Sequence, residues 1–398
     1  MTKPQGLILA LALTLAFIGL APLLQPAWLL TLFLVPFSLV LYLIKDTRYV
    51  SLSIIVLAVL YGLGWLSTFV FTCTLGIVVI GEVVFRLTGD QQVAYLHHLI
   101  AAIAVSVAVM FYLQYTVPLV AVMGVVVAVL LRAALRGRDD ALMIEALGVA
   151  MTMFLFEDLN FEVDLTLLIA AAIIGFGFGY IAYRVRVADI SGLFSGAMIG
   201  IILIVFADVR WFLIMLTFFI IGAGATRYRY SDKKQLGVAQ EHGGVRGYFN
   251  VFANGLVATA AAILFGLTGH PAFVALFMGS VASAAADTVA SEIGVTGKVP
   301  YLITTLRPVP RGTNGGVTFR GEIAAVIASA VVAVVAWMMG VADPWMVVVT
   351  VIAGFVGTNV DSLVGATLEN SGRIGNSGTN LIATFSGGIA GMLIYMLG

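Results

Sequence analysis

Apolar residues dominate the chain in runs of about 20, separated by short polar or turn-forming segments. A run of this length can cross the hydrocarbon core of a bilayer as a helix, because a helix rises about 1.5 Å per residue. The pattern predicts an all-α fold, a polytopic transmembrane bundle of about 15 helices. The predicted spans lie near residues 6–23, 27–44, 51–65, 67–85, 97–113, 117–134, 141–156, 165–183, 190–206, 209–225, 247–267, 271–289, 323–340, 345–363 and 379–397.

The composition supports a membrane location. Hydrophobic residues fill 61% of the 398 positions and charged residues only 10%, whereas a soluble domain has about 25% charged residues. We therefore expect membrane lipids to surround most of the chain. Acidic and basic residues balance, and no basic array indicates nucleic acid binding. The single cysteine, Cys73, excludes an internal disulfide framework.

The distribution of charge predicts an orientation. If the N-terminus lies inside, every Lys and Arg except Arg210 falls in an inner loop. The outer loops then carry acids, such as Glu157 and Asp343. Basic residues concentrate on the cytoplasmic side of membrane proteins. We therefore predict that the N-terminus is inside, that the C-terminus is outside, and that the polar loops of the C-terminal half are cytoplasmic.

The character of the sequence changes near position 160. Residues 1–160 are rich in large Leu and Val side chains, whereas Gly, Ala, Ser, Thr and Asn become frequent from about residue 165. Small residues let membrane helices approach closely, and polar residues among them form sites. We predict an N-terminal hydrophobic transmembrane extension, 1–160, without an assigned role, and a catalytic domain, 161–398.

The segment 286–294 places two carboxylates, Asp287 and Glu292, at the end of an apolar span. Ionisable groups are costly inside a membrane and usually serve a site. Hard cations such as Mg²⁺ prefer carboxylate oxygen. Asp287 is therefore the first candidate for a magnesium ligand, with Glu292 as a second. The alternative is that the two acids only cap the packing between helices.

The connection 298–322 combines basic side chains with proline and glycine. Glycines let a backbone wrap closely around an anion, and basic groups complement its charge. This loop is predicted to cradle a polyphosphate, the alternative being an ordinary basic loop against lipid phosphates. The residues of this predicted cradle are Lys298, Arg307, Arg311, Thr313, Asn314, Gly315 and Gly316.

A further acid, Asp361, lies near the inner end of its span, as Asp287 does. Two such acids on neighbouring helices are placed to share a metal or to position a phosphate acceptor. Asn380 lies close to the start of the last span, where a helix N-terminus favours an anion. Polar packing between helices is the alternative for this cluster.

A polar stripe is predicted at the start of the span near 247–267. Arg246, Asn250 and Asn254 recur every four residues, so they share one helix face. Such a stripe entering an apolar span is expected to face a cavity rather than lipid. The arginine suits a phosphate group, with the two asparagines beside it.

Three polar segments resemble a known family. The segments 287–294, 304–316 and 361–369 are similar, in order, to those of the integral membrane family of plant phytyl-phosphate kinase and animal transmembrane protein 19. The resemblance covers about residues 165–398, and the N-terminal extension resembles an arrangement of prokaryotic, particularly archaeal, members. The chain is more distantly similar to CTP-dependent dolichol kinases and CDP-diacylglycerol synthases.

The resemblance implies a membrane-embedded kinase at the cytoplasmic face of the cell membrane. It would transfer a phosphoryl group from a nucleotide, with CTP as the expected donor, to an isoprenoid monophosphate, with Mg²⁺ as cofactor. The residues expected to carry out catalysis are Asp287, Glu292, Arg307, Arg311 and Asp361.

Two alternatives stay open for the function. One is a CTP-dependent nucleotidyltransferase that makes a CDP-lipid, and the other is a lipid or isoprenoid transporter. The predicted polar groups crowd one face of the membrane rather than its midplane, which favours an enzyme over a transporter. The sequence leaves the prenyl chain length, the donor base and the oligomeric state open.

Overall fold

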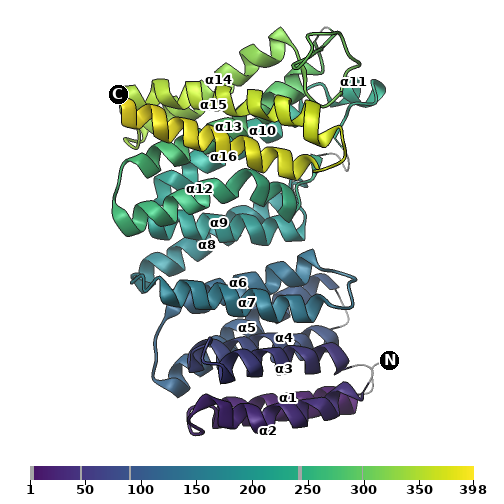
Figure 1. The fold of residues 1–398 in the computed structure, drawn as a ribbon, viewed down its shortest axis with the longest axis vertical. Coiled ribbons are helices and arrows are strands. Elements are labelled where there is room, and N and C mark those ends of the chain that lie inside the picture. Colours follow the sequence, from purple (N-terminus) through teal and green to yellow (C-terminus); the bar gives the residue numbers. More distant parts are fainter. Residues whose placement is uncertain (1–3, 45–46, 89–90, 241–243, 298) are drawn as a thin grey trace. The chain divides into compact units, whose positions relative to one another are not determined.

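The computed structural model describes residues 4–44, 47–88, 91–240, 244–297 and 299–398. Most of these residues are helical, and the described part of the chain contains two strands of two residues each. The prediction of an all-α polytopic membrane protein is confirmed. The chain divides into two compact units, Met1–Leu168 and Ile169–Gly398, whose elements are labelled in Figure 1.

Each predicted span coincides with a helix, and nine helices of the described residues are long and apolar enough to cross a membrane. The predicted ends differ from the observed ones. Helix α5 (Gln91–Leu113) begins before position 97, and α13 (Ala272–Gly294) continues beyond 289. Polar side chains at these ends lower the hydropathy without interrupting the helical backbone. The short helix α11 (Tyr230–Gln235) was not predicted, because it is too short and polar to span.

In the N-terminal unit, helices that follow one another pack as pairs: α2 with α3, α4 with α5, and α6 with α7. Helix α4 also contacts α1 and α7, so that it lies at the centre of the unit and is largely buried. The helices of this unit besides α5 are α1 (Pro4–Leu20), α2 (Ala27–Tyr42), α3 (Arg48–Gly62), α4 (Thr68–Leu87), α6 (Pro118–Ala134) and α7 (Ala141–Asp158).

Buried charges connect the helices of this unit. Glu82 of α4 pairs with Arg86, one turn further along the same helix. It also pairs with Arg132 of α6, whose Nη2 lies 2.5 Å from Glu82 Oε2. His98 Nε2 of α5 lies 3.6 Å from Glu145 Oε1 of α7, and both side chains are fully buried. An unpaired charge is costly in a low-dielectric interior, which explains why Glu82 occurs together with Arg86 and Arg132.

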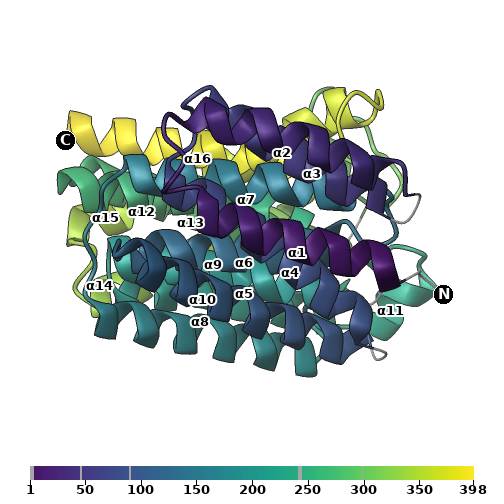
Figure 2. The same cartoon turned by 90° about the horizontal axis from the view of Figure 1, so that it is seen from below.

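The C-terminal unit is built around α13, which packs against α10, α12, α14, α15 and α16. Its long helices run roughly side by side along one direction, as two perpendicular views show (Figures 1 and 2). The remaining elements of the C-terminal half are α8 (Leu165–Arg184), α9 (Ile190–Phe206), α10 (Val209–Arg227), α12 (Tyr248–Thr268), α14 (Phe319–Met338), α15 (Pro344–Val364), the π-helix η3 (Gly365–Glu369) and α16 (Asn376–Leu397).

Small residues allow the helices around α13 to approach closely. A side chain at Gly279 would overlap the backbone carbonyl of Gly387 on α16, and one at Gly357 would overlap Ser283. Ser283 Oγ donates to the carbonyl of Ala383 at 3.0 Å, which satisfies its hydroxyl inside the bundle. These contacts are typical of membrane helix interfaces, where packing rather than hydrophobic burial holds helices together.

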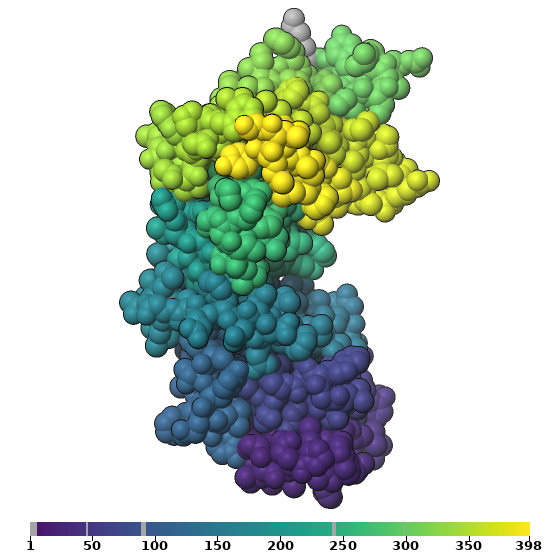
Figure 3. All heavy atoms as spheres, turned by 60° about the vertical axis from the view of Figure 1, so that its left-hand side comes forward, coloured from purple at the N-terminus to yellow at the C-terminus, as the bar shows by residue number. Residues whose placement is uncertain are grey.

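Large apolar side chains cover the outside of the helices, as expected for surfaces that face lipid. Phe111 in the N-terminal unit is 80% exposed, and Phe319 and Leu397 in the C-terminal unit are 83% and 88% exposed. Figure 3 shows the surface of one side of the chain, where the end of α16, in yellow, lies on the outside of its unit.

Candidate functional site

The polar loop between α13 and α14 is held by a small antiparallel ladder. Its strands are β1 (Tyr301–Leu302) and β2 (Gly316–Val317), and the Ile303 amide donates to the Gly315 carbonyl at 3.0 Å. Thr318 follows directly and caps α14, its hydroxyl accepting from the Gly321 amide at 3.0 Å. The part of the loop from Tyr301 to Thr318 therefore enters α14 in a defined conformation.

This loop rests directly on the end of α15. Gly315 has a φ of 78°, and a side chain there would overlap Ala366. Asn370 Nδ2 donates to the Asn314 carbonyl at 3.2 Å and ties the loop to the residue that follows η3. A left-handed φ and the absence of room for a Cβ both require glycine at position 315.

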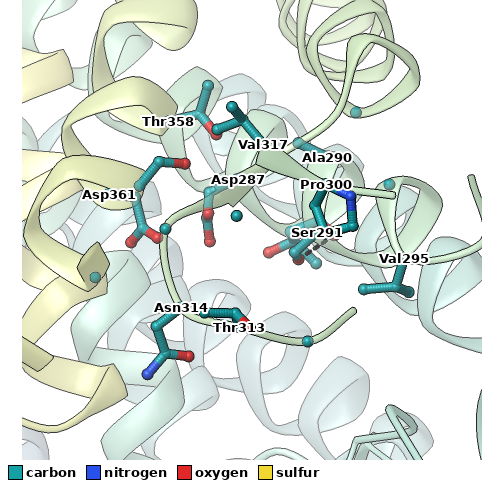
Figure 4. A pocket seen from close by; sticks show the side chains of 18 of the residues that line it. Asp287, Ala290, Ser291, Val295, Pro300, Thr313, Asn314, Val317, Thr358 and Asp361 are labelled. Atoms are coloured by element: carbon teal, nitrogen blue, oxygen red, sulfur yellow. Dashed lines mark hydrogen bonds between the residues drawn. The ribbon is translucent and has the colours of Figure 1, made fainter. Parts of the chain in front are cut away.

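A cavity of about 220 Å³ lies where the loop meets the ends of α13, α14, α15 and α16. Asp287 of α13 and Asp361 of α15 line it, and they are close enough to interact directly. Figure 4 shows the two carboxyl groups facing the same space, with Thr313 and Asn314 of the loop beside them. The spacing of residues within each helix does not predict that Asp287 and Asp361 lie close together, because this depends on how α13 and α15 pack.

The two acids fit a magnesium ion. Asp361 Oδ1 is buried and has no hydrogen-bond partner among the described residues. An oxygen in this state indicates a missing partner, because an unsatisfied buried polar group is costly. The described residues contain no group of three or more His, Cys, Asp or Glu arranged for a metal. Magnesium, however, usually takes one or two carboxylates together with substrate phosphates and water.

A π-helix brings another acid to the cavity. Helix α15 continues into η3, which ends at Glu369. Glu369 lines the cavity, and its Oε2 accepts from Thr379 Oγ1 of α16 at 2.8 Å. Asn376 and Asn380 lie one turn apart at the start of α16 and line the same cavity. Single π-turns in α-helices occur frequently at functional sites.

Arg246 enters the cavity from outside α12. The helix begins at Tyr248, so the expected stripe contains Asn250 and Asn254 but not Arg246 as a helical residue. The Arg246 amide instead donates to the Val187 carbonyl at 2.9 Å, and its carbonyl accepts from the Asp189 amide at 3.1 Å. These bonds replace the helical ones and fix the backbone of Arg246 beside the start of α9.

The guanidinium of Arg246 lies against aromatic rings. Its Cζ is 5.4 Å from the centre of the Phe218 ring and 5.2 Å from that of Phe219. The residue is 7% exposed. Burial lowers the pKa of Arg246 to about 10, and the nearby charge of Glu292 acts in the opposite direction. The group therefore carries a positive charge at neutral pH and suits an anion at the cavity wall.

The cavity collects most of the site residues expected from the sequence. It does not contain Glu292, Arg307 or Asn254, and Lys298 lies outside the described residues. Arg307 is exposed, and its carbonyl accepts from the Leu302 amide at 2.9 Å across the loop. The expected residues that line the cavity are Arg246, Asn250, Asp287, Arg311, Thr313, Asn314, Gly315, Gly316, Asp361 and Asn380.

Glu292 lies in a different environment from Asp287. Its carboxylate pairs with Lys233 of α11, and the two residues are 4% and 1% exposed. Lys233 Nζ also donates to the carbonyls of Ala225 and Thr226, at 3.1 and 2.7 Å. This network attaches α11 to the ends of α10 and α13. The arrangement gives Glu292 a structural partner, and Asp361 rather than Glu292 accompanies Asp287.

Several cavity residues were not assigned to the site from the sequence. Glu322, in the first turn of α14, lines the cavity, and its Oε2 accepts from Asn359 Nδ2 at 3.3 Å. Gln240 approaches from the segment after α11, and Glu369 is delivered by η3. The position of Glu322 four residues after the cap Thr318 was a usable signal, since acids favour the first turn of a helix. The other two depend on tertiary structure.

The fold and the cavity define a polytopic membrane protein with a polar cavity lined by acidic and basic side chains. The chain belongs to the family described as integral membrane protein DUF92, which matches residues 173–388. The family recognised from the three motifs is thereby confirmed. The match lies entirely within the C-terminal unit.

Relatives occur in archaea, cyanobacteria and plants. An uncharacterized membrane protein of Methanocaldococcus jannaschii is 34% identical over 211 residues, 53% of this chain and 87% of the relative. An uncharacterized membrane protein of Synechocystis sp. is 35% identical over 195 residues, 48% of this chain and 76% of the relative. Protein VTE6, chloroplastic, of Arabidopsis thaliana is 32% identical over 192 residues, 46% of this chain and 58% of the relative. No solved structure matches the chain.

Proposed function

We propose that the protein is a membrane-embedded kinase that transfers the γ-phosphoryl group of a nucleotide, CTP, to an isoprenoid monophosphate. The sequence similarity to VTE6, together with membership of the family, supports this class of activity. One structural observation carries the proposal. A single cavity between membrane helices collects Asp287, Asp361, Arg246 and Arg311 with a glycine-rich loop.

The reaction requires little acid–base chemistry from the protein. An oxygen of the acceptor phosphate attacks the γ-phosphorus of CTP, and the bond from that phosphorus to the β–γ bridging oxygen breaks. The lipid diphosphate forms and CDP leaves with the electron pair of the broken bond. An acceptor phosphate that is already a dianion has no proton to lose at the attacking oxygen. Positioning and charge neutralisation are the main needs of such a transfer.

The loop and the arginines meet these needs. Arg311 and the backbone of residues 312–316 line the cavity and are assigned to the phosphates of the nucleotide. Arg246 and Asn250 line both this cavity and a neighbouring apolar space, and they are assigned to the phosphate of the acceptor. Fixed cations at both phosphates lower the repulsion between two anions that must approach each other.

Asp287 and Asp361 are the residues that would hold Mg²⁺. The unpartnered Oδ1 of Asp361 and the direct neighbourhood of the two carboxyl groups support this assignment. The ion would supply positive charge to the nucleotide phosphates in the transition state. The two acids in turn keep the ion beside the loop that binds these phosphates.

The location follows from the same chemistry. A water-soluble donor and a membrane-dissolved acceptor meet most easily where polar loops join apolar helices, as they do at this cavity. We assign this face to the cytoplasm, because the basic residues of the chain gather in the loops on the same side. We further propose the cell membrane of a prokaryote as the location, a proposal that the archaeal and cyanobacterial relatives support.

Product analysis tests the proposal. The purified full chain, Mg²⁺, CTP and geranylgeranyl monophosphate are incubated, and lipid and nucleotide products are identified by mass spectrometry. We expect geranylgeranyl diphosphate and CDP. A CDP-lipid together with inorganic diphosphate would establish the nucleotidyltransferase instead. Unchanged CTP and unchanged lipid would contradict both.

A further inference from the structure

A second, apolar crevice of about 100 Å³ lies beside the polar cavity. Its walls come from α8, α9, α10 and α12, all parts of it lying in the C-terminal unit. Glycines make up much of two walls, because Gly175 and Gly179 lie one turn apart on α8, and Gly192, Gly196 and Gly200 follow the same spacing on α9. The crevice exists because these helices present no side chains along this line.

The crevice and the polar cavity meet at two residues. Arg246 and Asn250 line both of them. A ligand that occupies both spaces must carry an anionic group at one end, where the arginine lies, and an apolar chain behind it. This combination matches a lipid phosphate by charge and by hydrophobicity, and it excludes a wholly polar nucleotide from the crevice.

An unsatisfied polar group near this junction also indicates a ligand. Asn254 lines the crevice and is 4% exposed. Its Nδ2 donates to the Asn250 carbonyl at 2.9 Å, whereas its Oδ1 has no partner within the described part of the chain. A buried amide oxygen without a donor is costly. A water molecule that bridges this oxygen and the lipid phosphate is a suitable donor, because such bridges are nearly as favourable as direct hydrogen bonds.

The crevice narrows at Gly200. A Cβ at Gly200 would lie 3.1 Å from the Phe212 ring and 3.5 Å from Gly175 Cα, so α8, α9 and α10 converge there. Gly192 packs directly against the Arg246 carbonyl at the polar end. Gly200 lies eight positions after Gly192, which corresponds to about 12 Å along the helix. This length accommodates the part of a lipid chain nearest its phosphate.

We propose that this crevice binds the isoprenoid chain of the acceptor, with the phosphate at Arg246, and that the glycines of α9 determine which chains fit. The proposal rests on the proposed function for the identity of the acceptor. Beyond that function, we assign a binding site to the lipid chain and name Gly196 as the position that controls the width of the crevice. The position lies one turn, about 6 Å, beyond Gly192.

Gly196 offers a direct test because no atom lies within 4 Å of a Cβ placed there. Leucine at this position would fill the crevice without displacing the backbone. Gly177 of α8 provides a matched control. It also has no atom within 4 Å of a Cβ, but it is exposed and does not line the crevice. Leucine favours helix over glycine at both positions, so neither substitution should impair folding.

Binding is measured without nucleotide, so that the result does not depend on turnover. Full-length wild type, G196L and G177L are placed in phosphatidylcholine nanodiscs, and the dissociation constants of geranylgeranyl and dimethylallyl monophosphate are determined. G196L should weaken binding of geranylgeranyl monophosphate at least about tenfold, as displacing two CH₂ groups would. Its affinity for dimethylallyl monophosphate, whose chain ends before Gly196, should equal that of wild type, and G177L should bind both lipids normally.

The proposal would be overturned if G196L bound geranylgeranyl monophosphate as tightly as wild type does, or if G196L bound both lipids more weakly by the same factor. It would also be overturned if phosphatidic acid, a lipid with two chains, displaced geranylgeranyl monophosphate from the wild type as effectively as unlabelled geranylgeranyl monophosphate does. If the binding constants follow the expected pattern but the product analysis with CTP finds no phosphoryl transfer, the crevice is supported as the binding site of the chain and the kinase activity is contradicted. If wild type and G196L transfer the phosphoryl group equally well to both acceptors, the kinase activity is supported and the role of the crevice is contradicted.

Discussion

The carboxyl groups of Asp287, on α13, and Asp361, on α15, face the same cavity and lie close enough to interact directly. Two acids side by side repel each other unless a cation or a proton lies between them. Asp361 Oδ1 is moreover buried and without a partner among the residues that the structure describes. The pair is thus arranged to gain stability when a divalent cation binds.

Replacing either acid tests this relationship. Asp287→Asn and Asp361→Asn keep the side-chain shape and remove the charge that would hold Mg²⁺. We expect each to lower the rate of phosphoryl transfer by about a hundredfold or more, as the loss of a group that stabilises transition-state charge does. The initial rate is measured over a range of Mg²⁺ concentrations, and the requirement for Mg²⁺ should move to higher concentration.

A matched substitution at the opposite end of α15 provides the control. Asp343 is exposed and caps this helix by accepting from the Met346 amide at 2.7 Å. Asn caps as well as Asp does, so Asp343→Asn should leave the rate unchanged. Equal rates in wild type and Asp361→Asn would remove Asp361 from the metal site.

Arg246 should control the affinity for the acceptor. Arg246→Met removes a charge-assisted interaction with the phosphate and should raise the dissociation constant of the lipid monophosphate about 10- to 100-fold. The dissociation constant of CTP should stay within about threefold of wild type, because Arg311 and the loop bind the nucleotide in this account. Equilibrium binding of each ligand alone separates the two effects, and an equal loss of both would contradict the assignment.

The pH dependence of acceptor binding follows from the buried environment of Arg246. Its pKa is lowered to about 10 by burial, so its contribution to binding is present below that pH and lost as the pH rises through it. Arg246→Lys starts from an ordinary pKa near 10.4, which the same burial lowers further. The variant should therefore lose the acceptor at a lower pH than wild type. Coincident binding curves between pH 7 and 10.5 would contradict this explanation.

The Lys233–Glu292 pair should stabilise the fold rather than take part in the reaction. Both side chains are buried, so Lys233→Met leaves a carboxylate without its partner. Breaking a buried pair in this way costs about 3–5 kcal/mol. The double variant Lys233→Met/Glu292→Leu should recover much of the thermal stability and retain the rate of transfer per folded molecule. Loss of transfer in a stable double variant would show that Glu292 acts in catalysis.

Close packing around α13 predicts a sharp sensitivity at Gly279. A methyl group there would overlap the Gly387 carbonyl, which belongs to the backbone and cannot rotate away. Gly279→Ala should destabilise the C-terminal unit by about 1–3 kcal/mol, seen as a lower melting temperature in detergent. Gly177→Ala, which has open space around it, should melt at or above the wild-type temperature.

Local sequence patterns were sufficient to predict the helices and part of the site. Runs of apolar residues predict where the chain crosses a membrane, because the requirement for about 20 such residues acts within each segment. The glycine-rich loop was equally readable, since a positive φ at Gly312 and Gly315 needs glycine whatever surrounds it. Both kinds of prediction depend on neighbours along the chain.

The other features depend on contacts between distant segments. Lys233 and Glu292 belong to different helices, and no local pattern indicates that they pair. Arg307 and Arg311 look equivalent in the sequence and both are exposed, yet only Arg311 lines the cavity. The apolar crevice is likewise invisible in the sequence, because it arises only where the glycines of α8 and α9 meet.

The central claim is that the γ-phosphoryl group reaches a lipid phosphate at this cavity. Its most direct test uses CTP labelled on the γ-phosphate, Mg²⁺ and geranylgeranyl monophosphate with purified wild type and Asp361→Asn. We predict label in the lipid and release of CDP with wild type, and at least about a hundredfold less label with the variant. Unlabelled lipid accompanied by labelled diphosphate, or equal transfer by both proteins, would contradict the account.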